Sequence, residues 1–116
     1  MKALLAAACL MVACNVSALT SSDLLTYCNN KPTAESMLDY SVCATYIRGA
    51  IEMAEILHTT AGMKGHEQQF CLPTGKVDVQ SDVDFWLAYI RRHPNEINLP
   101  AAFTVFFAIS SEYPCE

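Results

Sequence analysis

The chain has 116 residues, six of them cysteines, and a formal net charge of −5 at pH 7. This length suits a single domain. Apart from the pair Arg91 and Arg92, the basic residues are scattered, so there is no basic stripe and nucleic acid is not an expected partner. An acidic surface favours solubility and a basic partner.

The first 18 residues have the features of an export signal. Lys2 supplies a positive charge, and the run from residue 3 to residue 13 is wholly apolar or small. A membrane-spanning helix needs about 20 apolar residues, so this run suits the core of a signal peptide instead. Small residues at 16–18 predict cleavage after Ala18. The folded domain is then residues 19–116, and we expect it in the periplasm.

A second interpretation of the N-terminus involves Cys14. The sequence Met11-Val-Ala-Cys14 resembles a lipobox, in which the cysteine is lipidated and becomes the new N-terminus. Met is uncommon at the first position of this motif. Lipidation would anchor the protein to a membrane without changing the folded domain, and we expect no other contact with a membrane.

Four cysteines follow the predicted cleavage site: Cys28, Cys43, Cys71 and Cys115. An even number in an exported domain predicts two disulfides, and three pairings are possible. We expect Cys28–Cys43, which bracket a short connection, and Cys71–Cys115, which would anchor the last helix to the central loop. Each would contribute roughly 2–4 kcal/mol. Zinc is the rival interpretation, but no close Cys-x-x-Cys pair is present, so we expect neither a metal nor a cofactor.

The apolar pattern predicts an all-α fold, a compact bundle of about four to five helices. The first helix is short, with N-cap hydroxyls at residues 20–22 and Asp23 in its first turn. Thr33 is expected to cap a long second helix that ends near Gly62, and Gly49 within it predicts close approach of another helix. The buried face of this helix follows the i, i+3, i+4 spacing and comprises Tyr40, Cys43, Ala44, Ile47, Ile51 and Ala54, widened by Ala50, Met53 and Leu57.

Two further helices are expected in the C-terminal part. The third runs from about residue 79 to 93 with Asp78 as its N-cap, and Phe85, off its apolar stripe, is expected to face a second subunit. Its water-facing residues are Asp82, Asp84, Arg91 and Arg92. Pro100 suits the first turn of the fourth helix. One face of that helix carries Ala102, Phe103, Phe106, Ile109 and Tyr113, with Val105 and Phe107 on other faces. A helix that is apolar almost all round is central in a bundle or covered by a partner.

No arrangement of residues for catalysis is evident, so we expect the protein not to be an enzyme. His66 and Cys71 could form a thiol–imidazole pair, but an exported cysteine with a partner is far more often in a disulfide. His58 and His93 lie near predicted helix ends, where a cation complements the helix dipole.

Four sequence motifs, in this order, resemble the Rap/Tai family of type VI secretion immunity proteins. They are Cys43-x-x-Tyr46-Ile47-x-Gly49, Phe70-Cys71-x-Pro73, Tyr89-Ile90-x-x-His93-Pro94 and Tyr113-Pro114-Cys115. The resemblance covers nearly all of the predicted domain. It implies a small helical periplasmic protein, often a homodimer, that binds a secreted antibacterial toxin. In the best understood branch the toxin is a peptidoglycan amidase, and the immunity protein occludes its catalytic cleft.

The long irregular stretch at residues 61–76 is the predicted contact region. Occlusion needs a projecting segment on a rigid base, and loops longer than about 12 residues are often functional. The expected toxin-binding residues are Met63, Lys64, His66, Glu67, Gln68 and Gln69. The alternative is a solvent-exposed connector with no partner.

Two other functions stay open at this point. The first is a small periplasmic holdase or acid-stress chaperone, which predicts exposed apolar surface. The second is an orphan accessory domain of the same fold that does not bind a toxin.

Overall fold

The computed structural model describes residues 18–29, 32–65, 70–72 and 78–115. Within these ranges the regular elements are α2 (Ser21–Cys28), α3 (Met37–Met63), α4 (Val79–Arg92), the 3-10 helix η2 (Pro94–Glu96) and α5 (Ala101–Glu112). The one strand-like contact in the same ranges is an isolated bridge between Thr20 and Pro100. The predicted all-α class is confirmed, and so are the disulfides Cys28–Cys43 and Cys71–Cys115.

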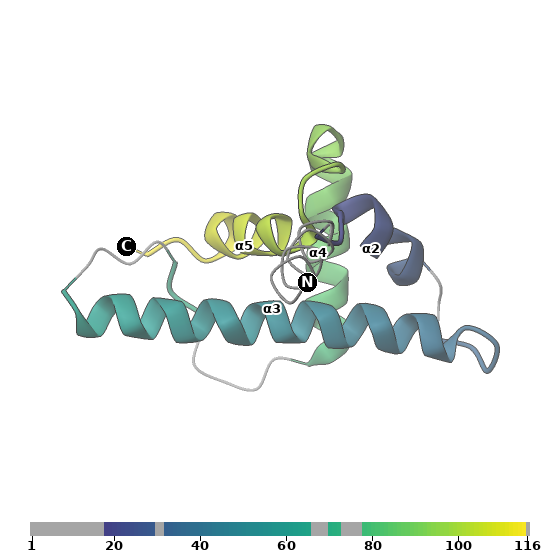
Figure 1. The fold of residues 1–116 in the computed structure, drawn as a ribbon, viewed down its shortest axis with the longest axis horizontal. Coiled ribbons are helices and arrows are strands. Elements are labelled where there is room, and N and C mark those ends of the chain that lie inside the picture. Colours follow the sequence, from purple (N-terminus) through teal and green to yellow (C-terminus); the bar gives the residue numbers. More distant parts are fainter. Residues whose placement is uncertain (1–17, 30–31, 66–69, 73–77, 116) are drawn as a thin grey trace, which may run out of the picture.

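The long helix α3 forms a base on which the other helices pack (Figure 1). α5 runs along one half of α3, α2 lies over the other half, and α4 crosses α3 between them. The C-terminal end of the chain and the last turns of α3 lie at the same end of the molecule. Cys71, in the short described stretch after α3, lies beside the C-terminal segment, to which it is joined by a hydrogen bond and a disulfide.

The start of α2 is held by a capping box, as the predicted N-cap hydroxyls suggested. The Thr20 hydroxyl accepts the backbone N–H of Asp23 at 3.1 Å, and the Asp23 carboxylate accepts the backbone N–H of Thr20 at 3.1 Å. Hydrogen bonds to Thr20 favour the charged carboxylate and lower the pKa of Asp23 below its ordinary value of 3.8. The backbone N–H of Ser21 donates to the Leu99 carbonyl at 2.8 Å, which joins α2 to the segment before α5.

The beginning of α3 differs from the prediction. Its N-cap is Ser36 and not Thr33, whose hydroxyl lies 2.9 Å from the Ser36 hydroxyl in the preceding turn. Gly49 is not explained by a close helix contact, because a Cβ built there would meet no atom within 4 Å. The helix ends at Met63, and Gly65 stops it with a φ of 74°, the left-handed conformation common just beyond a helix C-terminus.

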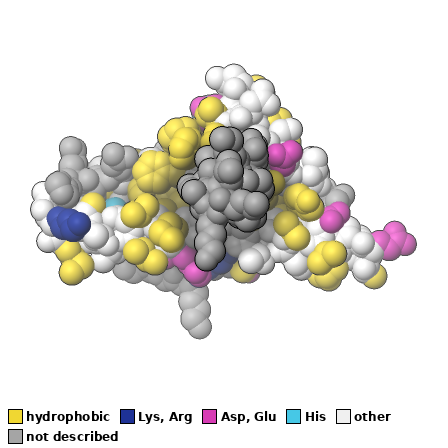
Figure 2. All heavy atoms as spheres, viewed as in Figure 1, with side chains coloured by type: hydrophobic (Ala, Val, Ile, Leu, Met, Phe, Trp, Pro, Cys, Tyr) yellow, Lys and Arg dark blue, Asp and Glu magenta, His cyan; other side chains and the backbone are white. Residues whose placement is uncertain are grey.

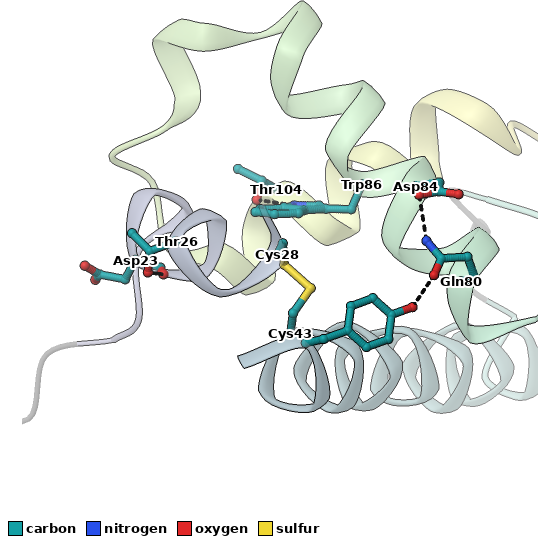
Figure 3. The surroundings of a disulfide bond; sticks show 9 residues. Asp23, Thr26, Cys28, Cys43, Gln80, Asp84, Trp86 and Thr104 are labelled. Carbon is teal, nitrogen blue, oxygen red and sulfur yellow. Dashed lines mark hydrogen bonds between the residues drawn. A yellow bond between two sulfur atoms is a disulfide. The ribbon is translucent and has the colours of Figure 1, made fainter. Parts of the chain in front are cut away.

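A polar cluster lies within the core beside the Cys28–Cys43 disulfide (Figure 3). The Trp86 indole N–H donates to the Thr104 hydroxyl at 3.0 Å, and the Ser21 hydroxyl lies 2.8 Å from that of Thr104. All three side chains are fully buried. Buried polar groups in proteins are hydrogen-bonded, and here each of the three side chains comes from a different helix. Their hydrogen bonds therefore join α2, α4 and α5 at one point in the core.

Asp82 does not face water, contrary to the prediction. It is buried, and its carboxylate lies 3.2 Å from the guanidinium of Arg48 on α3, which also pairs with Glu52 at 3.2 Å. Burial raises the pKa of Asp82, and the hydrogen bond from Arg48 opposes this shift. The ion pair between Arg48 and Asp82 links α3 to α4 at the edge of the core.

Phe85, predicted to face a second subunit, has neighbours within its own chain. It packs, half-buried, against the core, with its ring centroid 6.0 Å from that of Tyr113 after α5. Part of its ring remains accessible, and the contact with a second subunit stays a prediction.

The buried faces of α3 and α5 are narrower than the sequence predicted. The core-facing residues of α5 are Ala101, Thr104, Val105, Ala108 and Ile109. The predicted apolar face therefore matches the buried one only in part: Ile109 is in the core, but Ala102 and Phe103 are exposed, and Val105, assigned to another face, is buried. Met53 and Leu57 of α3, predicted to widen its buried stripe, are also exposed. Large apolar side chains of both helices therefore remain on the surface.

Candidate functional site

The C-terminal end of α3 projects from the core and carries two of the predicted contact residues. The side chain of Met63 is 84% exposed, and Lys64 is exposed as well. The backbone N–H of Lys64 donates to the carbonyls of Thr60 and Ala61, so the last turn is closed just before Gly65. The other four predicted contact residues, His66, Glu67, Gln68 and Gln69, lie outside the described residues.

The chain returns to the core directly after this segment. Phe70 is buried, stacks on His58 with ring centroids 4.7 Å apart, and meets Phe106 edge-on at 5.6 Å. The next residue, Cys71, donates its backbone N–H to the Tyr113 carbonyl at 2.8 Å and bonds covalently to Cys115. Both ends of the segment 64–70 are therefore fixed, one by α3 and the other by the buried ring and the disulfide.

Of the two histidines predicted near helix ends, one takes the expected position and the other does not. His58 lies within α3, five residues before its end, and its Nδ1 is buried without a hydrogen-bond partner while its ring packs on Phe70. His93 is the C-cap of α4, as expected for a residue at a helix end, and its Nδ1 lies 2.9 Å from the Tyr89 carbonyl. His58 therefore packs against Phe70, the first described residue after the predicted contact residues.

The described residues hold no arrangement that points to catalysis or to a metal. The Cys71 sulfur is bonded to Cys115, so the thiol required for a thiol–imidazole pair is absent from the oxidised chain. No group of three or more His, Cys, Asp or Glu residues in the described ranges could hold a metal ion. With their sulfurs in disulfides, the four cysteines cannot form the zinc site considered from the sequence.

A second surface, missed at the level of sequence, lies between the two parallel-running helices α3 and α5. We call it the α3–α5 groove: a depression of about 440 Å³ lined by Ala50, Met53, Ala54, Leu57, Ala102, Phe103, Phe106 and Phe107. Hydrophobic side chains gather over this part of α3 and α5 on the face shown in Figure 2. The sequence signal was the nearly all-round apolar character of α5, which predicted either a central position or a cover.

These features define a disulfide-stapled helical module that presents surfaces for binding. The family model of Rap1a immunity proteins matches residues 20–115, and the chain belongs to that family. The resemblance inferred from the four motifs is thereby confirmed. Neither the curated proteins nor the solved structures contain a match to the chain.

Family membership defines the kind of partner. An immunity protein binds a toxin protein, so a toxin is the partner expected for this chain. Within the described part of the chain, no helix is both long and apolar enough to span a membrane. The predicted signal peptide and Cys14 lie outside the described residues, except for Ala18.

Proposed function

We propose that the protein is a periplasmic immunity protein that binds a type VI secretion effector and blocks its catalytic cleft. The observation that carries this proposal is the match of residues 20–115 to the Rap1a immunity family. A peptidoglycan amidase is the toxin class that the motif resemblance favours. Inhibition by obstruction needs no catalytic group on the inhibitor.

The segment 64–70, whose two ends are fixed, suits such a mechanism. A segment that enters a cleft loses conformational freedom on binding, and fixing it beforehand reduces that cost. Here the segment begins at the closed last turn of α3 and ends at Phe70 and the Cys71–Cys115 disulfide. Met63 and Lys64 extend from its first end, where an exposed apolar tip and a cation can reach a partner.

The proposed location rests on the export signal and on the disulfides. Disulfides persist in oxidising compartments such as the periplasm and are rare in the cytosol. The family match begins two residues after the predicted cleavage site at Ala18, which supports processing at that point. Lipidation at Cys14 is the competing proposal, and mass spectrometry of the protein isolated from membranes and from periplasmic extract separates the two.

The proposal is tested with wall-degrading effectors in two steps. The immunity protein is used to capture candidate effectors, and each one captured is then expressed in the periplasm with and without it. We expect the captured effector to lyse cells alone and to be harmless with the immunity protein. If no peptidoglycan-degrading effector is bound or neutralised, the amidase proposal is wrong.

The contact segment is tested by alanine substitution in the same pair. Lys64→Ala combined with Glu67→Ala should weaken effector binding at least tenfold, measured by calorimetry, because the two substitutions remove charged side chains from the proposed contact segment. Arg92→Ala is the matched control, since Arg92 is an exposed cation at the end of α4. Equal affinity of the double variant and the control would discard the segment as the contact.

A periplasmic holdase is the second candidate, favoured by the exposed apolar side chains of the α3–α5 groove. A holdase binds unfolded chains of many sequences through such surface. It should therefore suppress aggregation of an unrelated, chemically unfolded client at equimolar ratio. An immunity protein should leave that aggregation unchanged.

A further inference from the structure

A hollow with mixed polar and apolar walls lies at the opposite end of α3 from the predicted toxin contact. We call it the Tyr40 pocket: it has a volume of about 370 Å³ and lies between the end of α2, the first turn of α3 and one face of α4. Ligand pockets have about 300–1,000 Å³ and combine apolar walls with a few polar groups. Residues 40 and 63 of α3 are roughly 35 Å apart along the helix, so this pocket is separate from the segment 64–70 and from the function proposed for it.

The floor of the pocket is apolar. It includes Val83 and Leu87, which lie one turn apart on α4, and Cys28 at the end of α2, and all three belong to the buried core. The disulfide between Cys28 and Cys43 holds α2 against α3 at this point. Because the floor is fixed before a ligand arrives, a small apolar group can pack on it without the cost of ordering the protein.

One end of the rim presents hydrogen-bond acceptors. The Tyr40 hydroxyl donates to Gln80 Oε1 at 2.5 Å, and Gln80 Nε2 donates to Asp84 Oδ1 at 2.9 Å, a bond drawn in Figure 3. The phenol proton is thereby engaged, which leaves lone pairs of Tyr40 and of the Asp84 carboxylate to accept further hydrogen bonds. Burial raises the pKa of Tyr40, and the negative charges of Asp84 and Asp78 raise it further. This end of the pocket therefore attracts a cation with N–H donors, such as an ammonium group.

The other end of the rim carries the opposite charge. Arg91 is exposed, lines the pocket and follows Asp84 by two turns on the same face of α4. Arg48 makes both ion pairs between described residues, so within the described ranges no charged side chain pairs with Asp84 or Arg91. A guanidinium binds a carboxylate through two parallel hydrogen bonds. Arg91 therefore offers an anion site about 10 Å along the helix from Asp84.

We propose that the Tyr40 pocket binds a zwitterionic dipeptide, with its ammonium group at Asp84 and Tyr40 and its carboxylate at Arg91. Two residues span at most about 7 Å, and a hydrogen bond of about 2.8 Å at each end joins them to charged groups about 10 Å apart. A single amino acid, about half as long, falls short of this separation. Val83 and Leu87 select small apolar side chains. The same chemistry belongs to dipeptides of L-residues from proteins and of D-residues from peptidoglycan.

The first test is an NMR titration of the isotope-labelled protein with L-Ala-L-Ala. The backbone amide signals of Val83 and Leu87 should shift with a dissociation constant on the order of 1 mM, because both charged ends stay partly in water. The signals of Met63 and Lys64 should not move. N-acetylation removes the positive charge of the probe and amidation removes its negative charge, so each should weaken binding about tenfold. A titration with D-Ala-D-Ala names the source: tighter binding than L-Ala-L-Ala assigns the ligand to peptidoglycan, and weaker binding assigns it to proteins.

The second test pairs each charge of the ligand with its partner on the protein. Arg91→Gln should weaken binding of L-Ala-L-Ala about tenfold, and amidation of the probe should then have no further effect. Asp84→Asn should do the same, with N-acetylation as the modification that loses its effect. Arg92→Gln is the matched control, since Arg92 is also exposed, follows directly on α4 and bonds to the Ala88 carbonyl outside the pocket. The NMR spectrum of each variant shows directly that it folds.

Three results would overturn the proposal. The first is the absence of any shift at Val83 and Leu87 when the probe is present at ten times the expected dissociation constant. The second is equal binding of the free, acetylated and amidated dipeptides, since recognition would then not depend on charge. The third is equal affinity of Arg91→Gln and Arg92→Gln, which would place the dipeptide outside the Tyr40 pocket.

Discussion

Removal of the Cys71–Cys115 disulfide tests how much this bond contributes to the free energy of unfolding. The bond joins residues 44 apart in sequence, compared with 15 for Cys28–Cys43. In the chain-entropy model the stabilisation grows with the logarithm of loop length, which gives about 4 kcal/mol for the larger loop and about 3 kcal/mol for the smaller. The variant Cys71→Ala/Cys115→Ala should therefore lose about 4 kcal/mol of the free energy of unfolding.

The second disulfide provides the comparison. Cys71 is exposed and Cys115 half-buried, so their alanine variant loses little packing, whereas Cys28 and Cys43 are in the core and their removal adds the cost of a cavity. Urea unfolding followed by circular dichroism measures both variants. Reduction of the Cys28→Ala/Cys43→Ala variant, which retains the Cys71–Cys115 bond, should reproduce the same loss of about 4 kcal/mol. A loss below about 1 kcal/mol for Cys71→Ala/Cys115→Ala would contradict the loop-entropy reasoning.

Three further predictions concern stability. Thr104→Val should cost about 1–3 kcal/mol in urea unfolding, because it leaves the buried indole N–H without an acceptor, while Thr104→Ser should cost less. Burial and a carboxylate partner raise the pKa of Tyr89 to about 12. The neutral phenol of Tyr89 therefore stabilises the fold fully below its ordinary pKa of 10, and this contribution is lost as pH rises from 10 to 12. In an alkaline titration the free energy of unfolding of Tyr89→Phe should fall less steeply than that of the wild type. Gly65→Ala should lower the thermal midpoint, since a left-handed alanine costs about 1–2 kcal/mol, and Gly49→Ala should raise it, because the helix gains up to about 1 kcal/mol with no clash.

The sequence predicted what depends on local pattern and on covalent constraint. The helix order followed from apolar periodicity and from the prolines at 32, 94 and 100, and the disulfide pairing followed from the positions of the cysteines along the chain. The cap of α3 was missed because Thr33 and Ser36 are both competent N-cap residues three positions apart. Local propensity does not choose between them.

Whether a residue is buried depends on contacts between helices, which the sequence pattern does not reveal. Asp82 on α4 can be buried because Arg48 on α3, 34 positions earlier, donates a hydrogen bond to its carboxylate. Met53 and Leu57 follow the same periodicity as the core residues of α3 but are exposed, since they border the α3–α5 groove, where α5 lies beside them without covering them. A periodic stripe therefore predicts which face can be buried, and the neighbouring helix decides how much of it is.

The two disulfides join the four cysteines that follow the predicted cleavage site in sequential order, Cys28 with Cys43 and Cys71 with Cys115. We propose export from the N-terminus, in which neighbouring thiols emerge together, so sequential oxidation would already produce this connectivity. Thiol exchange, which takes seconds to hours, is then not required for maturation. The second disulfide forms only once Cys115 has emerged, so a chain that stops before this residue lacks the bond that joins Cys71 to the segment after α5.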